Sequence, residues 1–147
     1  MSNQAPVSSN ASRYLFLFLI GLFMGAICVV MLLRALEARK TWQDRYPYAT
    51  MHLLEVHLVQ LNAARTANRC LATDAFPHVQ ALRMLANDLE PAFPALRDDA
   101  RFIQHAGQLR EVLDVAMTSM PQGCAAIEQL TSDIGQACKA CHQDFRN

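Results

Sequence analysis

The chain has 147 residues, which is enough for one membrane segment and one domain of about a hundred residues with a single core. Thirteen basic and thirteen acidic residues give a formal net charge of zero, so no excess of positive charge points to nucleic acid as a partner. From Thr41 onward nine basic residues stand against twelve acidic ones, and the whole chain has only five glycines and six prolines, which favours helices over strands.

The N-terminal residues combine a short polar stretch with a long apolar one. Residues 1–13 are mostly small and polar, and we expect a disordered tail there. Tyr14 to Leu33 then form twenty consecutive residues without a charge. A helix of about twenty apolar residues spans a hydrocarbon core of about 30 Å. The sequence therefore predicts a transmembrane anchor over residues 14–36.

A cleaved signal peptide is the alternative for this stretch. Its apolar region would be about 7 to 15 residues long and would end at small residues in an A-x-A-like pattern. The exit from this stretch reads Leu32-Leu33-Arg34-Ala35-Leu36-Glu37 and has no such site. Cys28 follows Ile27, where lipoprotein processing requires a small residue. An uncleaved anchor is therefore the preferred interpretation.

The remaining residues show helical periodicity. Residues 37–47 are predicted to be a linker or an extension of the membrane helix, which Pro47 breaks or restarts. Apolar residues at spacings of three and four then predict four helices, over about residues 48–68, 76–89, 96–120 and 124–145. Pro77 fits near the first position of the second of these helices. The prediction is an all-α protein in which residues 48–147 form an antiparallel up-down four-helix bundle.

The motif Cys138-Lys139-Ala140-Cys141-His142 lies near the end of the fourth predicted helix. Two cysteines separated by two residues and followed by histidine are the signature of covalent c-type haem attachment. Thiols three residues apart on a helix can each add to one vinyl group of the porphyrin, while the adjacent histidine directs a nitrogen at the iron. We therefore expect one covalent haem c, with His142 as the proximal iron ligand.

Two other kinds of site share part of this motif. A zinc site would need two further ligands at matched spacing, and the sequence has no second pair of that type. A redox-active dithiol usually begins a helix that follows a strand, whereas this motif ends an all-helical chain. Haem attachment is the preferred interpretation.

The C-terminal arrangement CxxCHxxFR, from Cys138 to Arg146, resembles the cytochrome c prime family. The resemblance implies a four-helix bundle with haem near the end of the last helix. It also implies that Cys138 and Cys141 are the thioether anchors, that His142 is the proximal ligand and that Arg146 is the basic residue beside it. Residues i and i+4 on a helix face one another, which independently supports the position of Arg146.

The orientation of the anchor brings two arguments into conflict. Arg34, Arg39 and Lys40 follow the apolar stretch while only Arg13 precedes it, so the positive-inside rule would place the C-terminal domain in the cytoplasm. The family resemblance implies haem attachment outside the bacterial cytoplasmic membrane. The positive-inside rule is a statistical bias, so we give the haem motif more weight in assigning the orientation. We expect a single-pass protein of the bacterial cytoplasmic (inner) membrane with its haem domain in the periplasm.

Cys70 and Cys124 fall at equivalent ends of two predicted helices. In an antiparallel bundle the first helix ends where the fourth begins, so both cysteines should lie at the end remote from the haem. A disulfide is plausible in an oxidising compartment and would contribute up to about 4 kcal/mol. Two buried free thiols are the alternative, and the sequence leaves this choice open.

The same antiparallel arrangement locates the distal side of the haem. Counting back from Cys70 by the distance from Cys124 to the haem motif reaches roughly Met51 to His57. Leu54 then points inward, and Met51 and His57 flank it by about 60° on either side. All three are candidate haem-contacting residues, and Met51 or His57 is at most a partial sixth ligand.

The family resemblance leaves the sixth ligand open. Its members often place a non-ligating apolar residue over the iron, and some supply methionine. The family's arginine four residues before the distal position has no match here, because Thr50 precedes Leu54. His52 falls on the far side of its helix, and His78 and His105 lie on other helices as expected surface residues.

Two functions follow from a single haem. One-electron transfer to a membrane or periplasmic redox partner is preferred, because tethering to the lipid bilayer raises the local concentration near respiratory complexes. Binding of small gases such as NO or CO at an open distal face is the alternative. We expect no enzymatic activity, since no acid–base pair is evident near the distal position. Gly21 and Gly25 form a small-xxx-small pair suited to a homodimer of anchors.

Overall fold

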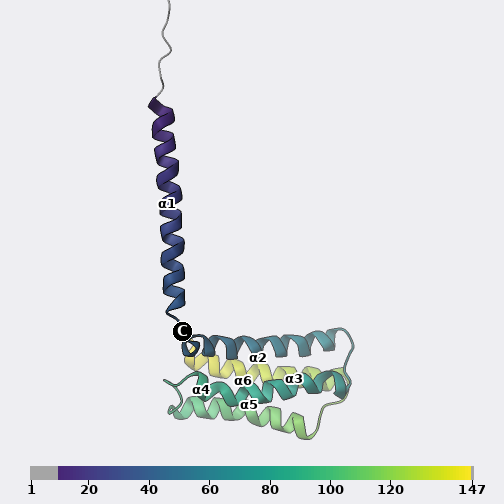
Figure 1. Cartoon of the computed structure of the whole chain (residues 1–147). Helices are drawn as coiled ribbons and strands as arrows, with labels where there is room; N and C mark the ends of the chain where they lie inside the picture. Colours follow the sequence, from purple (N-terminus) through teal and green to yellow (C-terminus); the bar gives the residue numbers. More distant parts are fainter. Residues whose placement is uncertain (1–9, 147) are drawn as a thin grey trace, which may run out of the picture. The chain divides into compact units, whose positions relative to one another are not determined.

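The computed structural model describes residues 10–146, and every regular element within them is helical. These residues form two compact units that divide between Thr41 and Trp42. The elements are shown in Figure 1 and are α1 (Asn10–Ala38), α2 (Trp42–Thr66), α3 (Ala72–Leu85), the 3-10 helix η1 (Ala86–Asp88), α4 (Leu89–Ala92), α5 (Ala100–Thr118) and α6 (Cys124–Phe145).

Helix α1 constitutes the first unit. Within the described residues it is the one helix long and apolar enough to cross a membrane, with a mean hydropathy of 2.9 over its most apolar window and no burial by the rest of the chain. The predicted anchor, residues 14–36, lies inside α1. Of the predicted tail, residues 1–9 lie outside the described residues, whereas residues 10–13 belong to this helix.

The second unit begins earlier than the sequence predicted. Helix α2 starts at Trp42 instead of Tyr48 and contains Pro47 as its sixth residue, so the prediction that Pro47 breaks or restarts the helix is wrong. The break lies between Ala38 and Trp42. A proline this close to a helix start removes a single backbone hydrogen bond, here the one to the carbonyl of Gln43. The helix tolerates that loss.

Two other helix starts were also misplaced, and local capping explains both. Helix α3 begins at Ala72 instead of Phe76, because the Asp74 carboxylate accepts a hydrogen bond from the Leu71 backbone N–H at 3.2 Å. Helix α5 begins at Ala100 instead of Leu96, because the Asp99 side chain accepts from the backbone N–H groups at the start of the helix. These polar caps override the apolar periodicity used to predict the boundaries.

Helices α2, α3, α5 and α6 pack around one core. Helix α2 contacts α3 and α6, and α5 contacts the same two helices. Figure 1 shows the four helices side by side. Each contributes fully buried side chains, and the largest of these are Leu61, Val79, Leu82, Leu113, Ile127 and Ile134. Burial of each such apolar side chain contributes about 1.5–3 kcal/mol to the stability of the fold.

A disulfide joins Cys70 and Cys124, whose Cα atoms lie 5.0 Å apart, so the open choice between a disulfide and free thiols is resolved. The Gly123 backbone N–H donates to the Cys70 carbonyl at 3.2 Å beside it. Gly123 has a φ of 84°, which favours glycine, and it leads directly into α6. The end of α2 therefore meets the start of α6, and these two helices run in opposite directions.

The segment between α3 and α5 is held by ion pairs. The Arg110 guanidinium donates to both carboxylate oxygens of Glu90, at 2.7 and 3.0 Å, and to the carbonyl of Ala86 at 3.0 Å. This partner lowers the pKa of the Glu90 carboxyl below its ordinary value. Since the pair is partly buried, it fixes η1 and α4 against α5. Three residues of this segment border the cavity described next.

Candidate cofactor site

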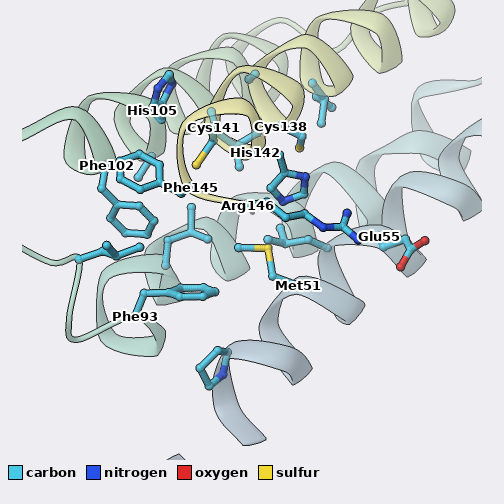
Figure 2. A pocket seen from close by; sticks show the side chains of 18 of the residues that line it. Met51, Glu55, Phe93, Phe102, His105, Cys138, Cys141, His142, Phe145 and Arg146 are labelled. Atoms are coloured by element: carbon cyan, nitrogen blue, oxygen red, sulfur yellow. The ribbon is translucent and has the colours of Figure 1, made fainter. Parts of the chain in front are cut away.

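A cavity of about 690 Å³ lies among α2, α3, α4, α5 and α6, and Figure 2 shows its lining side chains. Small-molecule and cofactor sites usually occupy about 300–1,000 Å³ and are mostly apolar with a few polar groups. The lining here is mainly aliphatic and aromatic. Six of the seven haem-contacting residues predicted from the sequence line it, namely Met51, Leu54, Cys138, Cys141, His142 and Arg146.

Helix α6 supplies the chemically reactive side of the cavity. Cys138, Cys141 and Phe145 follow one another at spacings of three and four and therefore share a helix face. Neither Cys138 nor Cys141 is in a disulfide, and both are half-buried. The exposed His142 lies next to this face, and its carbonyl accepts a hydrogen bond from the Arg146 backbone N–H at 3.0 Å. The motif thus directs two thiols and one imidazole to the same cavity.

The ionisation of the two thiols argues against a redox-active dithiol. Burial raises the pKa of Cys138 above its ordinary value. Burial also raises the pKa of Cys141, and the nearby Cys138 and Asp144 raise it further. Reactive dithiols instead have a lowered thiol pKa and commonly sit at a helix N-terminus. Cys138 lies well inside α6, which starts at Cys124.

Helix α2 supplies another part of the lining. Leu54 is only 8% exposed and lines the cavity, as the sequence predicted, with the partly buried Met51 one turn before it. Figure 2 shows Met51 and Glu55 from α2 beside His142 and Arg146 from α6. Thr50, at the position where the family resemblance would place an arginine, is a buried residue at 2% exposure. The buried and partly buried side chains that α2 contributes to the cavity are therefore apolar, whereas His52 and Glu55 are exposed.

The structure does not bring His57 to the cavity. Its Nδ1 lies 3.4 Å from Nδ1 of His78 on α3, and His57 is not among the lining residues. The exposed His52 does line the rim, although the sequence analysis placed it on the far side of its helix. Its Nδ1 lies 3.9 Å from a Glu55 carboxylate oxygen, so an acid–base pair that the sequence analysis missed is present at the rim.

Aromatic side chains close one end of the cavity. The rings of Phe93 and Phe102 lie 5.8 Å apart, and those of Phe102 and Phe145 meet edge to face at 5.5 Å. All three residues line the cavity. The sequence analysis did not assign them to the site. Phe145 was identifiable in principle, since it is four residues after Cys141 on the same helix face.

The expectation that His105 is an ordinary surface residue is wrong. Its side chain is 16% exposed and its Nε2 lies 3.0 Å from a carboxylate oxygen of Asp144. Its Nδ1 is buried and has no hydrogen-bond partner among residues 10–146. His105 also lines the cavity, three residues after Phe102 on the core-facing side of α5. That spacing within the apolar stripe of α5 was the available sequence signal.

These side chains fit a covalently held porphyrin better than a bare metal ion. An apolar cavity of this size accommodates a large flat ring, and the two thiols and one imidazole match its attachment chemistry. Within residues 10–146, no three His, Cys, Asp or Glu side chains gather closely enough to hold a metal ion by themselves. Comparison with protein-family models, curated proteins and solved structures finds no match for this chain. A functional assignment therefore depends on the residues and their geometry.

Proposed function

We propose that this chain is a membrane-anchored c-type cytochrome with one covalent haem c, and that α2, α3, α5 and α6 form an antiparallel up-down four-helix bundle of the cytochrome c prime kind. The observation that carries the proposal is the convergence of Cys138, Cys141 and His142 on one mainly apolar cavity, which Leu54 and Met51 also line. The ring of contacts among α2, α3, α5 and α6 and the opposed directions of α2 and α6 support the bundle.

The residues of α6 have distinct roles in this proposal. Each of the Cys138 and Cys141 thiols would add its S–H across one vinyl group, which would form a C–S bond and release nothing. His142 would hold the iron through an imidazole nitrogen, and Arg146 follows it one turn later at the rim. When bound, haem supplies an iron that changes its oxidation state by one electron. The surrounding apolar side chains would limit the access of water to that iron.

One-electron transfer is the proposed activity. Helix α1 would confine the cytochrome to the plane of the bilayer, which raises its effective concentration at a membrane or periplasmic redox partner. We propose no enzymatic role, because the side chains of His52 and Glu55 are 57% and 74% exposed, so bulk water surrounds the acid–base pair at the rim. A closed site that expels water strengthens the electrostatic interactions of such groups, and this pair lacks that closure.

The proposed location is the bacterial cytoplasmic membrane, with a single uncleaved anchor and the haem domain in the periplasm. The length and hydropathy of α1 support a membrane span. The disulfide between Cys70 and Cys124 supports an oxidising compartment, because such bonds persist there and are rare in the cytosol. Both observations agree with haem attachment outside the cytoplasm.

Mass spectrometry of the denatured protein tests the central proposal. Because two thioether bonds survive unfolding, we expect the mass of the chain plus one haem, including after extraction with acidified organic solvent. The Cys138→Ala/Cys141→Ala variant should lose the haem under the same extraction, whereas Cys28→Ala should retain it. Extraction of the haem from the unaltered protein, or retention of the haem by the double variant, would contradict the proposal.

Binding of small gases is the second candidate, and the buried Leu54 is the observation that favours it. An apolar side chain over the iron leaves an open coordination position for small neutral ligands, whereas a Met51 ligand would favour electron transfer. Visible absorption spectra of the oxidised, reduced and CO-treated protein separate the two. A low-spin reduced spectrum unaffected by CO supports electron transfer. A high-spin reduced spectrum that converts fully to a CO adduct supports gas binding.

A further inference from the structure

His142 lies in the last turn of α6, where the helix backbone by itself gives little support. The last four carbonyls of a helix have no amide within the helix to bond, and helix ends fray readily. Helix α6 ends at Phe145, and the N–H of Arg146 donates to the His142 carbonyl. The direction of the His142 side chain therefore depends on what holds this turn against the other helices.

Helix α5 holds it through His105. The Nε2 atom of His105 lies 3.0 Å from the carboxylate of Asp144, two residues after His142. The two side chains are 16% and 39% exposed, so water competes only weakly for this bond on the histidine side. A hydrogen bond between a helix end and the neighbouring helix resists rotation of the end about the helix axis.

The same histidine also contacts the next residue along α6. Its ring meets the Phe145 ring edge to face, with 6.2 Å between their centres. Phe102 meets another edge of Phe145, and the Arg101 guanidinium lies 5.4 Å from the centre of that ring. His105 thus touches two consecutive residues of the turn that carries His142, while its neighbours on α5 enclose Phe145.

The presence of histidine at this position has a free-energy cost. Within the described residues, Nδ1 of His105 is buried without a hydrogen-bond partner, and burial of an unpaired polar atom is unfavourable. Phenylalanine or leucine would fill much the same space without that cost. Neither could bond to Asp144. The bond to Asp144 is therefore what distinguishes histidine from the apolar residues that would otherwise suit this position.

We infer that His105 is a positioning residue for the iron ligand: its bond to Asp144 and its ring contact with Phe145 set the rotation of the last turn of α6, and hence the direction of the His142 imidazole. This inference rests on the proposed function, in which His142 is the axial ligand. It assigns a role to a residue on α5 to which the proposed function gives none.

Electron paramagnetic resonance of the oxidised full-length protein tests the inference, because the g values depend on the orientation of the axial imidazole. His105→Phe keeps an aromatic ring beside Phe145 and removes the bond to Asp144, so we expect shifted and broadened signals. His105→Gln retains a side-chain N–H donor and should restore signals closer to those of the parent. His78→Phe, on a partly buried histidine away from the cavity, is the matched control and should leave the signals unchanged.

The outcomes separate this inference from the proposed function. If the unaltered protein carries no covalent haem by mass, the proposed function fails. If the haem is present and His105→Phe has parental g values, only the positioning role is overturned. If circular dichroism shows that His105→Phe does not fold, Asp144→Asn tests the inference instead. This variant preserves the size of the side chain and weakens its hydrogen bond to His105. Parental signals in Asp144→Asn would then overturn the inference, and shifted signals would support it.

Discussion

Cys70 and Cys124 are joined by a disulfide that ties the end of α2 to the start of α6 across a sequence separation of 54 residues. Neither cysteine lines the cavity. The bond restricts the unfolded chain without taking part in the cofactor site. Stability and cofactor chemistry can therefore be perturbed separately, which makes this pair a suitable first test of the structure.

Replacement of both residues in Cys70→Ala/Cys124→Ala should lower the free energy of unfolding by up to about 4 kcal/mol, the loop-entropy value for a closed loop of this length. Chemical denaturation followed by circular dichroism measures the change. The visible spectrum should stay parental because the cavity is untouched. Cys28→Ala is the control and should not alter stability of the second unit. An equally stable double variant would show that the disulfide contributes nothing.

His142→Ala should remove the proximal nitrogen from the iron while Cys138 and Cys141 can still form their thioether bonds. The reduction potential and visible spectrum of the purified variant should therefore differ from those of the parent, although the haem mass is retained. His52→Ala is the matched control, since His52 lies at the cavity rim with its side chain 57% exposed. A parental spectrum and potential in His142→Ala would show that another residue ligates the iron.

Leu54→Ala should open the distal side. Truncation of a leucine that is 8% exposed should accelerate CO association with the reduced protein and cost about 2–5 kcal/mol of stability. Flash photolysis and denaturation measure the two effects. Leu61→Ala on the same helix is the control, because Leu61 is fully buried and lies outside the cavity lining, so stability should fall while the CO rate stays constant. Equal CO rates in all three proteins would contradict a distal role for Leu54.

Acidification should weaken the second unit through His78. Burial lowers the pKa of His78 below its ordinary value of 6.5, and the nearby His57 and Arg69 lower it further. The unfolded chain then binds this proton more readily than the folded one. The contribution of neutral His78 to stability is complete above about pH 6.5 and is lost as pH falls through the lower folded pKa.

The difference in denaturation midpoint between the parent and His78→Gln reports this contribution. We expect the parent to lose more stability than the variant between pH 7.5 and pH 5. Parallel pH profiles for the two proteins would show that protonation of His78 is not coupled to folding. His52→Gln serves as the control at an exposed histidine and should follow the parental profile.

The proposed single-pass arrangement predicts that the second unit is accessible from outside the cytoplasm while the chain stays in the membrane. Protease added to spheroplasts should digest the second unit, and alkaline carbonate should leave the full-length chain in the membrane fraction. These results require an uncleaved α1 and a periplasmic domain. A soluble mature chain that begins near Glu37 would identify the apolar stretch as a signal peptide. Protection of the domain in spheroplasts would place it in the cytoplasm.

Local sequence patterns were sufficient to predict several features of this protein. The bounds of α6, Cys124–Phe145, agree with the prediction from periodicity and the turn at Gly123. Cys138 and Cys141 are three residues apart within that helix and therefore share a face, which depends on helical spacing alone. The apolar composition of α1 and the inward direction of Leu54 were predictable for the same reason.

Only the tertiary structure decided how the histidines are used. His57 and His105 both lie at edges of apolar stripes, yet one faces His78 on α3 and the other bonds Asp144 on α6. Periodicity gives the angle of a side chain around its own helix. It does not give the rotation and height of the neighbouring helix, which depend on the packing of all side chains between them. The partner of each histidine, and therefore its role, follows from that packing.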